Sequence, residues 1–179
     1  MRKVVTAVAM FLLAAALPAV ASLTIGATAP EFKTQASLGG KVFEFDLASA
    51  LKKGPVVLYF YPAAFTHGCT IEAHDFADAM DQYKALGATV IGVSHDTIET
   101  LNQFSVSECR SKFPVASDPD LAIAKSYDAI LAAAPQYANR TSYVIAKNGS
   151  IYYTYTDLNP DQHVANTLAA LKQLENSTK

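Results

Sequence analysis

The pattern of apolar and polar positions predicts two central strands. Residues 56–61 are apolar at nearly every position and end at Pro62, and residues 88–94 form a second largely apolar run. Runs of this length without alternation are typical of strands that are covered on both faces of a sheet. We therefore expect both segments in the middle of the fold.

Amphipathic patterns predict the helices. Apolar residues recur at three- and four-residue spacing after Cys69, until Gly87 stops the pattern. A second helix is expected over residues 97–111, before Pro114, and a short one over residues 121–130. Pro160 opens a last helix, and Asn159 is placed to cap it.

Two hairpins complete the predicted elements. Residues 29–47 alternate on both sides of Gly39-Gly40, and residues 141–157 do so around Asn148-Gly149. Strands that alternate with helices are typical of an α/β fold, and the late hairpin favours a mixed sheet over a purely parallel one. We predict an α/β fold with a central mixed sheet, flanking helices and an N-terminal β-hairpin at its edge.

Residues 1–21 have the composition of a targeting segment. Arg2 and Lys3 precede an apolar run that ends in Ala19-Val20-Ala21, a small-x-small arrangement typical of signal-peptidase sites. We predict a signal peptide cleaved after Ala21, a single domain over residues 22–179 and a periplasmic or secreted location without stable membrane association. A transmembrane anchor is the alternative, but the apolar run is short against the about 20 residues that span a bilayer.

Charge excludes one class of partner. The chain has 14 Lys plus Arg against 16 Asp plus Glu, and cleavage after Ala21 would remove two of the positive charges. A mildly acidic chain lacks the basic surface that nucleic-acid binding requires. We expect no nucleic-acid partner.

Cys69 is the first candidate for chemistry. It lies at the start of a predicted helix that directly follows a central strand. Unpaired backbone N–H groups and the positive end of the helix dipole stabilise a thiolate at this place. The position predicts a reactive thiol, and an inert buried cysteine is the alternative.

The sequence around Cys69 resembles a known family. YPAAFTHGCTIE, residues 61–72, is similar to the active-site segment of the peroxiredoxins, particularly of the Q-type branch, also called bacterioferritin comigratory protein. GVSHDT, FPVASDPD and NRTSYVIAKNGSI resemble later segments of that branch in the same order. The resemblance implies a thioredoxin-like fold and an antioxidant thiol peroxidase that reduces hydrogen peroxide, with alkyl hydroperoxides as further candidate substrates.

The resemblance also assigns roles to residues. It implies that Cys69 is the peroxidatic nucleophile and forms a sulfenic acid, that Thr66 and Pro62 shape its pocket, and that Arg140 is its cationic partner. Glu72 is expected to support Arg140 through an ion pair. No cofactor or metal is implied. The expected partners are a peroxide and a thiol electron donor such as a thioredoxin-like protein or glutathione.

The second cysteine departs from the pattern of many Q-type members. His74 stands where these have a resolving cysteine, and Cys109 is the only other cysteine of the chain. Cys109 is a candidate resolving cysteine, which would form a disulfide with Cys69 in each cycle. A passive buried thiol and a static structural disulfide stay open as alternatives.

Other functions and ligands are less consistent with the sequence. A thiol-disulfide oxidoreductase needs a second cysteine close by, and Thr66 occupies the place where its two-cysteine motif would begin. A copper or haem-delivery module lacks a second soft ligand near Cys69. His67 and His74 do not share one helical face with Cys69, which argues against a metal site.

Overall fold

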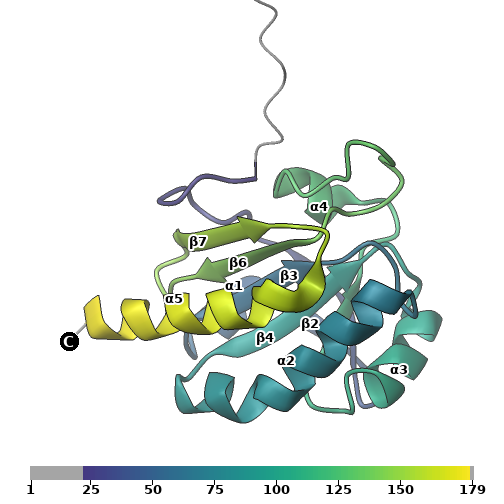
Figure 1. Ribbon diagram of the computed structural model, residues 1–179, viewed down its shortest axis with the longest axis horizontal. Coiled ribbons are helices and arrows are strands. Elements are labelled where there is room, and N and C mark those ends of the chain that lie inside the picture. Colours follow the sequence, from purple (N-terminus) through teal and green to yellow (C-terminus); the bar gives the residue numbers. More distant parts are fainter. Residues whose placement is uncertain (1–21, 178–179) are drawn as a thin grey trace, which may run out of the picture.

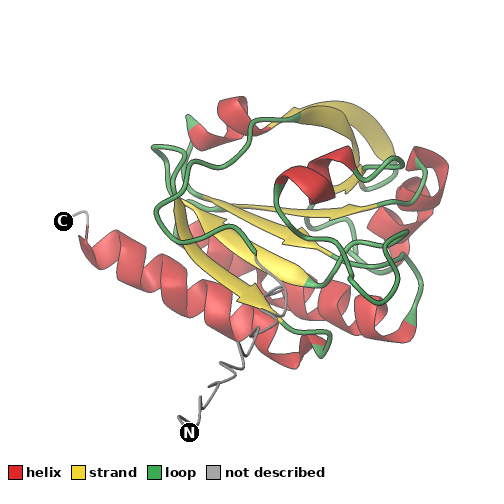
Figure 2. Cartoon of the chain, turned by 90° about the horizontal axis from the view of Figure 1, so that it is seen from above, coloured by secondary structure: helices red, strands yellow, loops and turns green. Residues whose placement is uncertain are grey.

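The computed structural model describes residues 22–177, so the predicted signal peptide lies outside the described residues. Seven strands form one sheet in the order β2-β1-β5-β4-β3-β6-β7, and helices cover both of its faces (Figure 1 and Figure 2). The strands are β1 Lys33–Leu38, β2 Lys41–Asp46, β3 Val56–Phe60, β4 Thr89–Ser94, β5 Val115–Ser117, β6 Thr141–Ile145 and β7 Ile151–Thr156. The helices are α1 Leu47–Leu51, α2 His67–Ala85, α3 Ile98–Ser107, α4 Ala122–Ser126, the 3-10 helix η1 Pro160–Gln162 and α5 His163–Ser177.

The predicted mixed sheet is confirmed. Strand β3 is buried along its whole length and pairs in parallel with β4 and antiparallel with β6. The two predicted hairpins are also present, since β1 pairs with β2 at one edge and β6 pairs with β7 at the other. Two full faces of apolar packing explain why residues 56–61 carry no polar alternation.

Two apolar clusters hold the layers together. On one face, buried side chains of α2, α3 and α5 pack against the sheet, among them Phe76, Phe104 and Leu171. On the other face, α1 and α4 supply Leu47 and Ile123. The first cluster contains both cysteines, so the chemistry of the chain lies on the α2 side of the sheet.

Two short elements were missed by the sequence patterns. Strand β5 has only three residues, all buried, and lies between β1 and β4, directly after the Pro114 at which we expected only the end of a helix. Helix α1 has five residues and is capped by Asp46, whose side chain accepts a hydrogen bond from the backbone N–H of Ser49. Elements of this length are too short to show a periodicity, so only tertiary pairing defines them.

The end of the second predicted helix is also different. We expected it to reach residue 111, but α3 ends at Ser107. Arg110 and Ser111 have φ values of +49° and +55°, in the left-handed region that does not continue a helix. Cys109 therefore follows α3 instead of lying within it.

The remaining helix predictions differ in extent. The short helix α4 covers residues 122–126 instead of the expected 121–130. The expected cap of the last helix is confirmed, because the Asn159 side chain accepts from the backbone N–H of Asp161 at 3.1 Å at the start of η1. None of the helices within residues 22–177 has the length and hydropathy that a bilayer span needs.

Candidate active site

Cys69 lies at the junction of the central strand and the helix that follows it. It is the third residue of α2 and only 2% exposed. The backbone N–H groups of a first helical turn have no intrahelical partner and carry a positive partial charge, which favours a thiolate over a thiol. The local sequence thus places an ionisable sulfur where the backbone itself stabilises the anion.

Arg140 is brought to Cys69 by the pairing of β3 with β6. It directly precedes β6, whose first residue Thr141 pairs with Phe60 at the end of β3. Its Nη2 donates to Cys69 Sγ at 3.4 Å, and the side chain is buried. A Cβ atom built on Gly68 would lie 3.1 Å from Nη2, so the glycine leaves room for the guanidinium.

Glu72 lies one turn after Cys69 and forms a buried ion pair with Arg140 through Nη1. The third nitrogen, Nε, donates to the carbonyl of Leu158 at 2.9 Å. Burial raises the pKa of Glu72, although the guanidinium acts against this change. Burial acts to lower the pKa of Arg140, but Glu72 and Cys69 raise it above its ordinary value, so the guanidinium stays charged beside the sulfur.

Thr66 and Pro62 lie in the loop that enters α2. Thr66 is the N-cap residue, but its hydroxyl donates to the carbonyl of Ala63 at 2.9 Å instead of capping the helix. Thr66 is exposed and Pro62 is partly buried. The hydroxyl oxygen of Thr66 keeps its capacity to accept a hydrogen bond at the entrance to the site.

The same loop is held by two residues that sequence reasoning did not assign. Asp96 Oδ2 accepts from the backbone N–H of Ala64 at 2.7 Å, and His95 Nδ1 donates to the carbonyl of Pro62 at 2.9 Å. Both belong to the segment after β4, the strand that pairs with β3. The only sequence signal was their place at the end of a predicted central strand.

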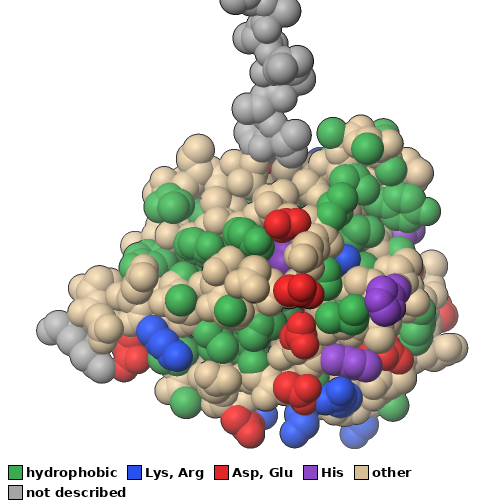
Figure 3. All heavy atoms as spheres, in the orientation of Figure 1, with side chains coloured by type: hydrophobic (Ala, Val, Ile, Leu, Met, Phe, Trp, Pro, Cys, Tyr) green, Lys and Arg blue, Asp and Glu red, His purple; other side chains and the backbone are tan. Residues whose placement is uncertain are grey.

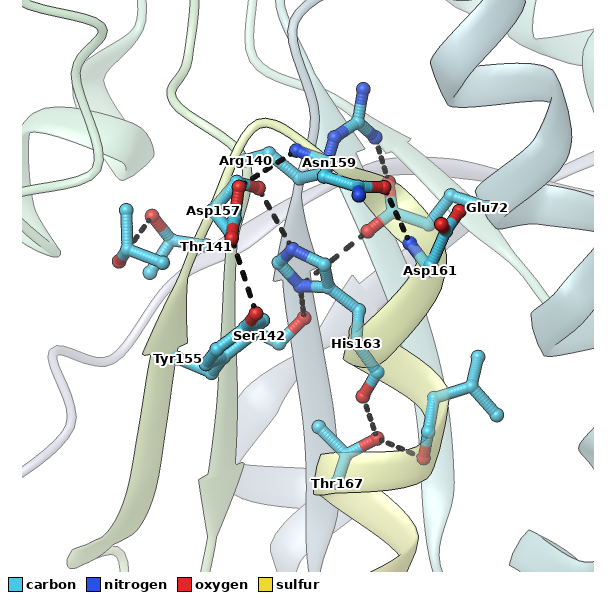
Figure 4. A network of polar contacts seen from close by, with 12 residues as sticks. Glu72, Arg140, Thr141, Ser142, Tyr155, Asp157, Asn159, Asp161, His163 and Thr167 are labelled. Carbon is cyan, nitrogen blue, oxygen red and sulfur yellow. Dashed lines mark hydrogen bonds and ion pairs between the residues drawn. The ribbon is translucent and has the colours of Figure 1, made fainter.

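A second missed group lies behind Glu72 and is shown in Figure 4. His163, the first residue of α5, is completely buried. Its Nδ1 lies 2.8 Å from Ser142 Oγ and 3.7 Å from Glu72 Oε1, and its Nε2 donates to the carbonyl of Asp157 at 2.9 Å. Burial lowers the pKa of His163 to about 4, so the imidazole is neutral at neutral pH.

Cys109 is a free thiol, as is Cys69. It is completely buried in the apolar cluster that also contains Tyr59, Tyr61 and Phe113. Burial raises the pKa of the Cys109 thiol well above its usual range. In this state of the protein the two cysteines form no disulfide, and Cys109 has the environment of an unreactive thiol.

His74, five residues after Cys69, contacts the end of another helix. His74 Nε2 lies 2.8 Å from Glu108 Oε2, which ties α2 to the end of α3. Within residues 22–177 no group of three or more His, Cys, Asp or Glu side chains is arranged to hold a metal ion. The described residues therefore offer no pre-formed metal centre beside the cysteine.

The assembled site suits nucleophilic attack by sulfur. Cys69, Glu72 and Arg140 come from two segments, are all buried and are joined by hydrogen bonds of the guanidinium. A guanidinium that is already oriented stabilises charge that moves from sulfur to a departing oxygen. Thr66 and Pro62 lie in the loop before this group.

Comparisons of the sequence and of the structure with known proteins all match members of one protein family. The model of the AhpC/TSA family matches residues 25–154. A chloroplastic peroxiredoxin Q of Sedum lineare is 33% identical over 156 residues, which cover 87% of this chain and 81% of the relative. A peroxiredoxin of Mycobacterium tuberculosis is 32% identical over 148 residues, covering 80% of this chain and 91% of that protein. The crystal structure of the peroxidoxin BcpB from Mycobacterium tuberculosis has a TM-score of 0.75 at 27% identity, covering 84% of this chain and 97% of that one.

The comparisons correct one prediction. A periplasmic or secreted location was expected from Arg2, Lys3 and the apolar run after them. The relatives instead carry chloroplastic names or come from a mycobacterium, and they give a periplasmic location no support. The expectation was wrong because it rested only on the composition of residues 1–21, which lie outside the described residues.

The family match extends over well more than half of the chain and includes the Cys69 segment. The two relatives are named as peroxiredoxins, and the solved structure is that of a peroxidoxin with the same fold. The chain therefore belongs to the AhpC/TSA family as a Q-type peroxiredoxin with the thioredoxin-like fold, and it is a thiol peroxidase.

Proposed function

We propose that the protein reduces hydrogen peroxide, and alkyl hydroperoxides as further substrates, through a sulfenic acid on Cys69. The observation that carries the proposal is the 3.4 Å contact between Arg140 Nη2 and Cys69 Sγ, in a guanidinium that Glu72 and Leu158 also hold. A peroxide that approaches the sulfur meets a fixed donor beside it. Residues 22–179 would act as one domain in this reaction.

The first step is an in-line displacement. The Cys69 thiolate attacks one peroxide oxygen, an S–O bond forms and the O–O bond breaks. Cys69 loses two electrons and becomes the sulfenic acid, and the peroxide is reduced. The departing oxygen leaves as hydroxide or alkoxide and takes a proton from solvent, giving water or an alcohol. Arg140 stabilises the charge on the oxygens in the transition state.

Thr66 and Pro62 would orient and enclose the substrate. The Thr66 hydroxyl already donates to Ala63, so its oxygen is available to accept a hydrogen bond from the O–H of a hydroperoxide. Pro62 has no N–H and ends the strand without adding a donor that would bind water at the sulfur.

Cys109 is the proposed resolving cysteine. Its thiol would attack the sulfenic acid, forming a disulfide with Cys69 and releasing water. A thiol donor such as a thioredoxin-like protein or glutathione would then reduce the disulfide. Both cysteines are buried, and a disulfide needs Cα atoms within about 7 Å. Because both thiols are packed in the apolar cluster, the first turn of α2 and the segment around Cys109 would open locally so that the donor reaches the disulfide.

A stopped-flow experiment on the reduced protein tests the proposal. Wild type, Cys69→Ser and Cys109→Ser are each mixed with one equivalent of hydrogen peroxide, and turnover is then followed with a panel of thiol donors. We expect Cys69→Ser to consume no peroxide. Cys109→Ser should consume its first equivalent at the wild-type rate and slow only in turnover. Peroxide reduction by Cys69→Ser at the wild-type rate contradicts the proposed nucleophile, and unchanged turnover by Cys109→Ser contradicts the resolving role.

A further inference from the structure

We propose that His163 is a positioning residue of this site, which keeps Arg140 aimed at Cys69 by supporting both groups that hold the guanidinium. The inference rests on the proposed function of Cys69 and Arg140. Figure 4 shows the imidazole between Ser142, Asp157 and Glu72, with the guanidinium of Arg140 at the other oxygen of the Glu72 carboxylate. His163 acts through other residues, and we assign it no contact with substrate.

The first support is the turn between β7 and η1. His163 Nε2 donates to the carbonyl of Asp157, and the next carbonyl, that of Leu158, accepts from Arg140 Nε. The backbone N–H of Asp157 also donates to the carbonyl of Arg140 at 3.2 Å. The imidazole thus holds the peptide unit next to the one that accepts from the guanidinium. The Leu158 peptide unit itself is held by the backbone N–H of Asn159, which donates to the Asp157 carboxylate at 2.9 Å. His163 therefore adds a second hydrogen bond that fixes Asp157 in this turn.

The second support is the rear of the Glu72 carboxylate. Oε2 pairs with Arg140, whereas Oε1 is buried and has no hydrogen-bond partner. His163 Nδ1 lies 3.7 Å from Oε1, a distance of packing and not of a hydrogen bond. Because Oε1 has no hydrogen bond, only packing against neighbouring side chains restricts the rotation of the carboxylate. The His163 ring provides this packing, and the Tyr155 ring lies against it at 4.8 Å between centroids.

The hydrogen bonds fix the tautomer that this role needs. A backbone carbonyl can only accept, so Nε2 carries the proton and Nδ1 accepts from the Ser142 hydroxyl. The charged groups that face the ring are Glu72, Arg140 and Asp157. With a neutral ring, Arg140 is the only cation that pairs with Glu72 among residues 22–177, so the carboxylate holds the guanidinium and not the imidazole.

Three variants separate positioning from general stability. His163→Leu keeps most of the side-chain volume and removes both polar contacts. His163→Gln restores an N–H donor at the reach of Nε2, which rescues the Asp157 contact. Thr167→Val is the matched control, because Thr167 is also buried in α5, one turn later, and bonds the carbonyl of His163 at 2.7 Å and Tyr83 at 2.7 Å. Removing the Thr167 hydroxyl weakens the same helix but leaves the hydrogen bonds of Glu72 and Arg140 intact.

Two readouts are compared at matched folded fractions: the second-order rate constant with hydrogen peroxide and the pH midpoint of Cys69 alkylation by iodoacetamide in a Cys109→Ser background. We expect His163→Leu to lose about tenfold in rate and to shift the alkylation midpoint upward, since small misplacements of a positioning group have effects of this order. His163→Gln should recover most of the rate constant and of the alkylation midpoint. Thr167→Val should leave both quantities at the values of the protein without a substitution in α5. A His163→Leu protein that matches Thr167→Val in both readouts overturns the inference.

The two proposals fail in different ways. If Cys69→Ser consumes peroxide as wild type does, the proposed function fails, but the alkylation midpoints still test His163 because they need no peroxide. If wild type depends on Cys69 and His163→Leu does not differ from Thr167→Val, only the positioning role fails. Should His163→Leu not fold, His163→Asn replaces it, since its shorter side chain cannot reach Asp157 and is expected to lose rate relative to His163→Gln.

Discussion

Arg140 uses each of its three side-chain nitrogens for a different partner: Cys69, Glu72 and the carbonyl of Leu158. A planar fork with several donors can make these contacts at once, and an ammonium on a flexible stem cannot. The value of the residue therefore lies in orientation as much as in charge. The resemblance to the peroxiredoxins pointed to Cys69, Glu72 and Arg140, and the structure places the three together.

Arg140→Lys should lower the rate constant for Cys69 oxidation by about 10²-fold, the order of effect of losing one oriented donor at a reacting centre. Stopped-flow mixing of the reduced variant with hydrogen peroxide measures it. Arg110→Lys is the control, because Arg110 is an exposed arginine paired with Asp78 at 2.5 Å. Equal rate constants for the two variants contradict a role for the geometry of Arg140.

The buried imidazole makes a prediction about pH. The pKa of His163 is 6.5 for the free group and about 4 in the fold, lowered by burial. The unfolded chain therefore binds a proton that the folded chain does not between these values, and stability is full above pH 6.5 and lost as pH falls towards 4. The difference corresponds to about 3 kcal/mol at most.

Urea unfolding at pH 7.5 and pH 4.5 tests this. Wild type should lose more free energy of unfolding on acidification than His163→Leu does, while carboxylates common to both proteins contribute equally. An identical loss of free energy of unfolding in both proteins would mean that His163 has its ordinary pKa in the folded state.

At the scale of elements, length decides what a sequence pattern can predict. The long helix α2, the strands β3 and β4 and the two hairpins have apolar patterns of their own, and all were predicted. Strand β5 and helix α1 have three and five residues, and pairing with distant segments defines them. His95, Asp96 and His163 were missed as site residues for the same reason, because their partners come from other elements.

The segment that carries Cys109 contains backbone strain. Ser111 has a φ of +55° and is exposed, and a non-glycine residue in this region costs about 1–2 kcal/mol. Ser111→Gly should therefore raise the free energy of unfolding by about 0.5–1 kcal/mol, after the entropy that glycine adds to the unfolded chain. Chemical denaturation measures the change. Ser107→Gly, at an exposed helical position of α3, should lower stability instead, and a loss in both variants contradicts strain at residue 111.

At the scale of the whole molecule, the face that carries α2 has an acidic stripe. Acidic side chains form a row down the front of the molecule in Figure 3. Burial raises the pKa of Asp75, and the nearby carboxylates of Asp161 and Asp78 raise it further, so these charges lie close together. Asp75 and Asp78 lie on α2, the helix that also carries Cys69. An anionic substrate would be repelled at this face.

A fatty-acid hydroperoxide carries a carboxylate, and we expect its rate constant to rise about two- to threefold between roughly 10 mM and 150 mM salt. The reason is that the Debye screening length falls to about 8 Å over this range, which weakens the repulsion. Hydrogen peroxide is neutral and should show no such change. Stopped-flow rates at a series of ionic strengths measure both. A carboxylate substrate that slows with added salt contradicts repulsion by this face.

The most direct test of the central claim is the site of first oxidation. Reduced Cys109→Ser protein is mixed with one equivalent of hydrogen peroxide in the presence of dimedone, which traps sulfenic acids, and the adduct is located by mass spectrometry of peptides. The account predicts one adduct, on Cys69, and its strong reduction in Arg140→Lys at the same reaction time. An unmodified Cys69 after the peroxide has been consumed would contradict the account.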